Sequence, residues 1–288
     1  MVRVYYAARK ARRKAEVPRP LLARRAPMRL NRAMMKPLAL MAAALFGLSA
    51  AVAMAEPGAA PFAGWSAVVI AGDYRATNGN PTKAFENARR DVAAALTRLG
   101  FSRANTIEMS VRPPEGEAGV TPAGSIKAID NALLSLRRHA TEGCLVYFTS
   151  HGDEGGVSLD EDKISPEQMN KLIRGACGQR PTILVISACH SGVFTEETLQ
   201  APNRMIFAAA RRDRPSFGCS EDAVYPFFDA CFLESTGGAK DFFDLTDKTR
   251  ACVEKRESEM GLEASDPQLF VGEGIEPLLR AAVFPPFS

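Results

Sequence analysis

Short apolar runs alternate with stretches of helical periodicity along most of the chain, and this alternation limits the possible folds more than any other feature. Strand-like apolar runs occur at residues 66–72, 106–111, 144–149, 182–187 and 204–209. Between them, apolar residues recur at steps of three and four, which is typical of helices with one buried face. Strands that are separated by helices pair in parallel, because each helix makes the crossover connection. We therefore expect a three-layer α/β fold, with a mostly parallel sheet flanked by helices on both faces.

Boundary signals mark three of the predicted helices. The first covers residues 87–99 and is followed by a glycine. The second is expected to begin at Thr121-Pro122, where Thr121 supplies the N-cap and Pro122 the first helical residue. The third begins at the sequence Ser-Pro-Glu-Gln of residues 165–168, which is a capping box with proline in its first turn.

The first 55 residues have the composition of an export leader. Residues 1–36 contain twelve Lys or Arg and one acid, and residues 37–55 carry no charge and end in Ala-Met-Ala. A basic region, an apolar region and small residues at the cleavage positions are typical of a secretory signal peptide. The same uncharged segment would also be long enough for a single membrane anchor. We expect cleavage near Ala55 and a periplasmic or secreted mature chain, which contacts a membrane only if the leader is retained.

The mature chain is then expected to be one domain, residues 56–288, with a C-terminal helical extension. Translation could also begin at an internal methionine, namely Met28, Met34 or Met35. The extension comprises a helix to about Arg256 and the segment 267–280, which either covers the functional edge or extends the sheet. Beyond residue 36 the chain has 24 basic and 32 acidic residues, so the expected domain is acidic. This charge balance excludes a basic nucleic-acid-binding domain.

Six cysteines are consistent with an oxidising compartment, where structural disulfides persist. None of them forms a C-x-x-C pair, so a zinc ribbon or a thioredoxin-type motif is not supported. Cys144 and Cys177 precede neighbouring parallel strands, so we expect them to form a disulfide at the amino edge of the sheet. One further pair is expected among the remaining downstream cysteines, Cys219, Cys231 and Cys252.

Chemically informative residues follow two successive strands of the predicted sheet. The third strand leads into Ser150-His151-Gly152, and the fourth leads into Ala188-Cys189-His190. In parallel sheets, the carboxyl ends of the strands meet at one edge, which is where the chemistry is found. Cysteine proteolysis needs a thiol nucleophile and a base that later protonates the leaving amine, and Cys189 and His151 are residues of the right types. The backbone N–H groups of Gly152 and Cys189 would form an oxyanion hole.

At these residues the sequence resembles the legumain-like cysteine peptidases of family C13, which have the caspase-type fold. The motifs TSHGD (149–153) and ISACHSG (186–192) are similar to the family's His and Cys boxes, and the similarity extends over about residues 66–232. The resemblance implies a three-layer caspase-like fold and a Cys/His dyad that acts on a polypeptide substrate through an acyl-enzyme intermediate. It implies no metal and no cofactor.

The sequence departs from the family at the positions that bind the substrate side chain. Ser187 stands where legumains have Glu two residues before the nucleophile. Asp229 matches the family's pocket Asp, and Ser216 falls in its pocket-wall serine stretch. The family's first-helix Arg corresponds either to Arg89, by the N-x-R pattern, or to Asn87, by the apolar stripe. The resemblance therefore leaves open whether Asn or a basic residue precedes the scissile bond.

Three alternatives remain at this stage. A transpeptidase would use the same dyad, because an amine can resolve an acyl-enzyme as water does. A caspase-fold binding protein with an inert dyad would also have this pattern. A metal site built from His151, Cys189 and His190 lacks a fourth ligand at a familiar spacing. The sequence does not define the oligomeric state.

Overall fold

A seven-stranded sheet forms the centre of the structure. The computed structural model describes residues 60–138 and 140–286, so the predicted leader and its cleavage site lie outside the described residues. Six strands of the sheet run in parallel, and the edge strand β10 runs antiparallel to β9. The strands are, in spatial order, β10 (Gln268–Val271), β9 (Arg204–Ala208), β8 (Thr182–Ser187), β4 (Gly143–Thr149), β1 (Trp65–Ala71), β2 (Thr106–Ser110) and β3 (Val120–Pro122).

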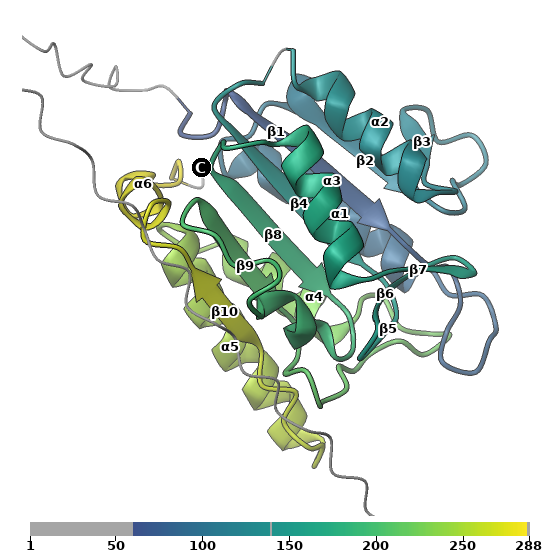
Figure 1. The fold of residues 1–288 in the computed structure, drawn as a ribbon. Helices are drawn as coiled ribbons and strands as arrows, with labels where there is room; N and C mark the ends of the chain where they lie inside the picture. Colours follow the sequence, from purple (N-terminus) through teal and green to yellow (C-terminus); the bar gives the residue numbers. More distant parts are fainter. Residues whose placement is uncertain (1–59, 139, 287–288) are drawn as a thin grey trace, which may run out of the picture. The chain divides into compact units, whose positions relative to one another are not determined.

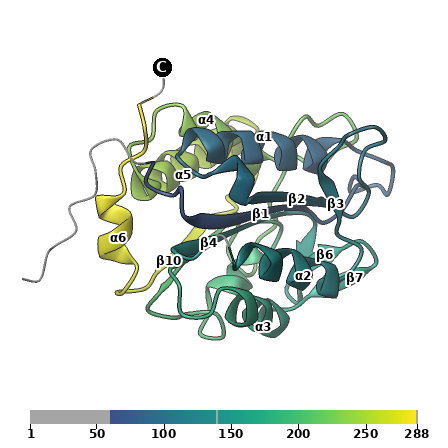
Figure 2. The ribbon, with the colours of Figure 1, turned by 90° about the horizontal axis from the view of Figure 1, so that it is seen from above.

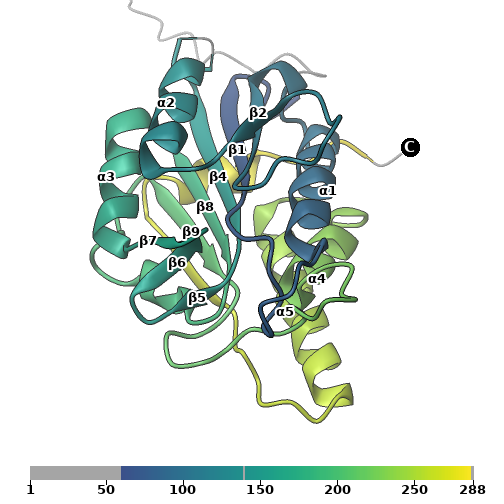
Figure 3. The same cartoon turned by 90° about the vertical axis from the view of Figure 1, so that its right-hand side faces the viewer.

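Helices cover both faces of this sheet, as expected (Figure 2). One face carries α1 (Ala84–Arg98), α4 (Phe227–Thr236) and α5 (Phe242–Glu259), and the other carries α2 (Ile126–Leu136) and α3 (Pro166–Ala176). Figure 3 shows these two layers from the side. The short elements are the 3₁₀ helices η1 (Arg103–Asn105) and η2 (Ser191–Thr195) and the helix α6 (Glu276–Ala281). Within the described ranges, no helix combines the length and apolar character that a membrane span requires.

Alternate residues of the central strands supply the two cores. Ala67 and Val69 of β1 pack under α1 and α4, whereas Val68 and Ile70 pack under α2 and α3. Every residue of β1, β4 and β8 is buried. Strands that are buried on both faces read as continuous apolar runs, which is why the sequence pattern predicted them correctly.

Two helix boundaries differ in how well the sequence predicted them. The third predicted helix has the expected capping box: Ser165 accepts from the Gln168 N–H, and the Gln168 side chain accepts from the Ser165 N–H. The predicted start of the second helix is wrong. Thr121 and Pro122 lie in the edge strand β3, and Ser125 is the N-cap of α2.

A second, small sheet follows the end of β4 (Figure 1). Its strands are β5 (Gly152–Asp153), β6 (Gly156–Leu159) and β7 (Asp162–Ile164), all antiparallel. The sequence pattern does not predict this sheet, because strands of two to four residues are too short to show an alternation. The C-terminal extension contains β10, which lengthens the main sheet beyond β9.

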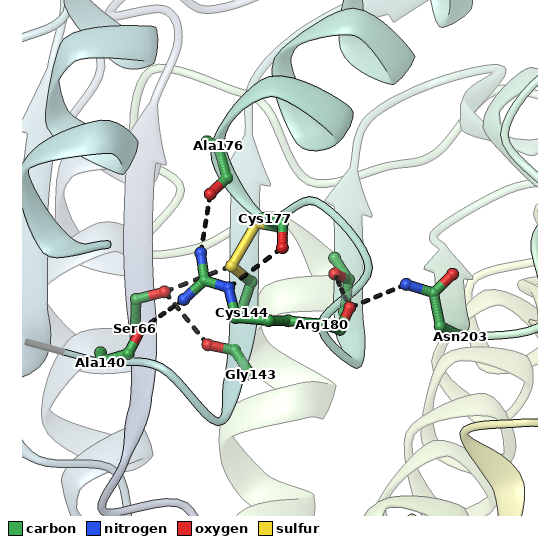
Figure 4. Close-up of a disulfide and its surroundings, with 9 residues drawn as sticks. Ser66, Ala140, Gly143, Cys144, Ala176, Cys177, Arg180 and Asn203 are labelled. Carbon is green, nitrogen blue, oxygen red and sulfur yellow. Dashed lines mark hydrogen bonds between the residues drawn. A yellow bond between two sulfur atoms is a disulfide. The ribbon is translucent and has the colours of Figure 1, made fainter. Parts of the chain in front are cut away.

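The amino edge of the sheet is cross-linked (Figure 4). Cys144 and Cys177 form a disulfide with their Cα atoms 6.0 Å apart, and a second disulfide joins Cys231 of α4 to Cys252 of α5. The Arg180 side chain donates to the carbonyls of Ala176 and Cys177 at the end of α3 and to a carbonyl preceding β4. These contacts hold α3, β4 and β8 together at the edge opposite the ends of the strands that carry His151 and Cys189.

Candidate active site

The register of β4 and β8 brings His151 and Cys189 to the same edge of the sheet. Thr149 of β4 is the partner of Ser187 of β8, and the two candidate catalytic residues each follow two residues later. Gly152 packs directly on the Cys189 backbone, because a Cβ at this position would lie only 2.6 Å from the Cys189 carbonyl oxygen. The two motifs that the sequence analysis singled out are therefore in contact.

Cys189 is partly buried and lies against the loop that follows β9. Its Sγ is 3.3 Å from both the N–H and the carbonyl oxygen of Ser216. Burial raises the pKa of the Cys189 thiol, and the hydrogen bond with Ser216 offsets this only in part. The next residue, His190, has a left-handed backbone (φ 56°), so the chain turns sharply just after the sulfur. Among the described residues, no backbone carbonyl accepts from the Cys189 N–H.

The ring of His151 is held by a backbone carbonyl. Its Nε2 atom lies 2.8 Å from the carbonyl oxygen of Arg75, in the loop after β1. Because a carbonyl only accepts, Nε2 carries the proton in the neutral ring, and Nδ1 is left as the basic nitrogen. Phe85 of α1 packs against the ring with a centroid separation of 5.1 Å, in an edge-to-face arrangement. The sequence gave no sign of this carbonyl contact, since any residue type can provide it.

Asp229 is fully buried beneath this edge and is bound by three hydroxyl groups. Tyr147 donates to Oδ1 at 2.6 Å, and Thr149 and Ser187 donate to Oδ2 at 2.9 and 2.7 Å. Burial raises the pKa of Asp229 to about 6, although these hydrogen bonds lower it. The strands β4 and β8 thus supply hydroxyl donors to this carboxylate just before the two candidate catalytic residues.

The structure does not support Arg89 as a pocket residue. Its side chain is 1% exposed and pairs with three carboxylates, those of Glu86, Glu108 and Glu117, rather than with Asp229. This face of α1 is directed at β2, and the three acids neutralise the guanidinium there. Asn87, the alternative match, is partly exposed and donates to the carbonyl of Val224.

Two further groups near the edge, and one cluster elsewhere, take no part in the candidate dyad. The Nδ1 atom of His190 lies 2.9 Å from the Arg212 carbonyl, so its ring is engaged with the loop after β9. Cys219 is a free cysteine. Burial raises the pKa of its thiol, and the negative charges of neighbouring groups such as Cys189 raise it further. Cys231, Glu234 and Cys252 converge elsewhere, on α4 and α5, but both sulfurs are in a disulfide and cannot ligate a metal as thiolates.

Comparison with solved structures places this architecture among the caspases. The crystal structure of caspase-1 from Spodoptera frugiperda is similar with a TM-score of 0.53 and 13% sequence identity, over 74% of this chain and 88% of that one. At this identity the likeness concerns the fold. No curated protein sequence matches the chain. The architecture is therefore a caspase-like fold, with a cysteine and a histidine at the carboxyl edge of its sheet.

A comparison with protein families matches the segment that carries these residues. The model of the peptidase C13 family matches residues 123–256, from the residues before α2 to near the end of α5. The match contains both the His151 and the Cys189 motif. This match and the caspase-like fold support a cysteine-type peptidase that is similar, over this segment, to the peptidase C13 family, the legumain-like cysteine peptidases.

Proposed function

We propose that this protein is an exported cysteine endopeptidase in which Cys189 is the nucleophile and His151 the general acid and base. The observation that carries the proposal is the contact between the two motifs: Gly152 packs on the Cys189 backbone at the edge where β4 and β8 end. The bond from His151 Nε2 to the Arg75 carbonyl supports it, because this bond leaves Nδ1 free to take a proton.

The proposed reaction begins with a neutral thiol, since burial raises the pKa of Cys189. The thiol proton passes to His151 Nδ1 as the sulfur attacks the scissile carbonyl carbon. The N–H groups of Gly152 and Cys189 then stabilise the oxyanion. The imidazolium gives its proton to the leaving amine, and a thioester between the substrate and Cys189 remains. His151 next removes a proton from water, hydroxide attacks the thioester, and the thiol regains the proton when the acid product leaves.

A basic residue before the scissile bond is the preference we propose. Asp229 matches the family's pocket acid, and its hydrogen-bond partners among the described residues are hydroxyls rather than a cation. Arg89 is neutralised by three other acids, so it does not offset this charge. An Arg or Lys side chain that displaced a hydroxyl would meet a carboxylate in a buried place, where ion pairing discriminates strongly.

A positional peptide library tests this preference. We expect Arg and Lys to be selected before the scissile bond, and Asp229→Asn to reduce cleavage of basic peptides much more than that of neutral ones. A preference for Asn that persists in Asp229→Asn would show that the pocket acid does not set specificity.

Labelling with a thiol-reactive peptide probe tests the dyad. We expect rapid labelling of the purified protein, none in Cys189→Ala, and a large decrease in His151→Ala. Cys219→Ala and His190→Ala are the matched controls and should label as the wild type does. Slow labelling that does not depend on His151 would instead identify an inert caspase-fold protein. Product analysis with an added amine nucleophile separates hydrolysis from transpeptidation.

Export is proposed from the leader, which lies outside the described residues. N-terminal sequencing of the protein recovered from the producing cells should find a chain that begins near residue 56. A chain that retains the basic segment in the cytoplasm would contradict export without affecting the proposed chemistry.

A further inference from the structure

The carbonyl that holds His151 belongs to a loop with unusually many polar restraints. Asp73 is 4% exposed, and its Oδ1 atom accepts from the N–H groups of Tyr74 and Arg75 at 2.7 and 3.0 Å. A side chain that binds the next two backbone N–H groups forms a local turn and fixes its orientation. The peptide plane that carries the Arg75 carbonyl therefore follows a turn set by Asp73.

The side chain of the same arginine binds the turn between β6 and β7. Its Nε donates to Asp73 Oδ1 at 3.0 Å, and its Nη2 donates to the carbonyl and Oδ1 of Asp160 at 3.1 and 3.2 Å. Its Nη1 pairs with Glu161. These charges raise the pKa of Arg75, and the hydrogen bond with Asp73 is the largest cause. We call these four residues, Asp73, Arg75, Asp160 and Glu161, the Arg75 clamp.

Strand β6, which leads into this turn, is also bound to the backbone of the candidate catalytic histidine. The Ser158 N–H donates to the His151 carbonyl at 2.9 Å, and the Asp160 N–H donates to the Gly72 carbonyl at 2.8 Å. Asp160 adopts a left-handed backbone (φ 55°) that residues other than glycine rarely adopt. These contacts restrain His151 from two sides. The Arg75 carbonyl binds its ring, and Ser158 binds its backbone. Asp160, two residues after Ser158, binds the Arg75 side chain.

We propose that Asp73 and Arg75 are positioning residues, which hold the Arg75 carbonyl against His151 Nε2 and thereby keep the imidazole in the tautomer whose Nδ1 is free. The inference about catalysis rests on the proposed function, since it concerns the base in that mechanism. Arg75 is suited to this role because its guanidinium neutralises three acids at once. Without it, Asp73, Asp160 and Glu161 would repel one another, and the loop would lose the contacts that orient its carbonyl.

Kinetics of Arg75→Gln and Asp73→Asn provide the first test. We expect kcat to fall by roughly 10- to 100-fold with little change in KM, because an orienting contact is lost while the substrate pocket is kept. Arg75→Lys retains the charge and should recover part of the loss. The matched control is Arg212→Gln: this arginine also pairs with an acid, Glu196, while its carbonyl contacts His190, and its loss should leave kcat unchanged.

Nuclear magnetic resonance of ¹⁵N-histidine-labelled protein provides the second test and does not depend on activity. The chain has three histidines, so His→Gln variants can assign the signals. We expect the neutral ring of His151 to be the Nε2–H tautomer in the wild type and a mixture of tautomers in Arg75→Gln. An unchanged tautomer and an unchanged kcat in Arg75→Gln would overturn the inference. An altered tautomer in a protein that cleaves no peptide would refute the proposed function and leave the clamp standing.

Discussion

Asp229 lies fully buried beneath the active-site edge, and replacing it with Asn should make the folded protein more stable at neutral pH. The pKa of this carboxyl rises from 3.8 to about 6 in the folded protein, with burial as the largest cause. The folded state therefore binds the proton more tightly than the unfolded chain does. This difference corresponds to about 3 kcal/mol of unfolding free energy, which is present below pH 4 and is lost as the pH rises through 6.

Asn has nearly the same shape but no charge to desolvate. Tyr147 can still donate to its side-chain oxygen, and the hydroxyls of Thr149 and Ser187 can rotate to accept from its NH₂ group. The pKa of about 6 already includes the effect of the three hydrogen bonds on Asp229, so no separate free energy is added for them. We expect the variant to match the wild type at pH 4 and to exceed it by up to about 3 kcal/mol at pH 7.5.

Urea unfolding at the two pH values measures this difference. Both proteins should carry Cys189→Ala, which prevents self-cleavage, and both should keep their disulfides. Asp222→Asn, at an exposed position, is the control for the loss of a surface charge. If the stability difference is the same at pH 4 and pH 7.5, or is larger at pH 4, the carboxylate is not a desolvated charge and the reasoning fails.

Three further changes should act at separate places in the molecule. Gly152→Ala should lower kcat/KM by at least about 100-fold, because its Cβ meets the Cys189 carbonyl and moves the reacting groups; a circular dichroism spectrum like that of the wild type would show that the fold is kept, and full activity would contradict the contact. Replacing Cys144 and Cys177 with Ala should lower the unfolding free energy by roughly 3–4 kcal/mol and leave kcat unchanged, since the bridge lies at the opposite edge; a loss of kcat in the folded variant would contradict this separation. Arg89→Met should destabilise the protein by about 3–5 kcal/mol, as judged by urea unfolding, because it removes the cation that Glu86, Glu108 and Glu117 share and leaves, among the described residues, only Glu108 with another, Arg103; a neutral effect would mean that these acids are solvated.

The sequence predicted the parts of the structure that depend on residue type over several positions. The strands β1, β4 and β8 are buried on both faces and appear as apolar runs, and the capping box of α3 requires particular side chains. The His151 and Cys189 motifs were predicted to meet because both follow strands of one parallel sheet. The alternation of strands and helices was therefore enough to predict that these motifs meet.

Other features depend on tertiary contacts that no local pattern carries. The Arg75 carbonyl at His151 is a backbone group, and its position depends on a loop whose restraints come from Asp160 and Glu161 in a distant part of the chain. The N-cap predicted at Thr121 is wrong because this segment pairs with β2 as the edge strand β3. The sequence left Arg89 and Asn87 as alternative matches to the family's pocket Arg, and the observed partners of Arg89 lie on β2 and the following loop as well as on its own helix.

The positions of Cys144 and Cys189 at opposite ends of the paired strands β4 and β8 also determine which sulfur atoms can exchange with one another. Cys144 lies beside the first residue of β8, and Cys189 follows the last residue of that strand by two positions. Seven residues of extended chain separate these points by about 23 Å. Once β4 and β8 have paired, the Cys189 sulfur cannot reach the Cys144–Cys177 bridge to exchange with it. The sheet thus acts as a rigid spacer that keeps the Cys189 thiol apart from the Cys144–Cys177 disulfide.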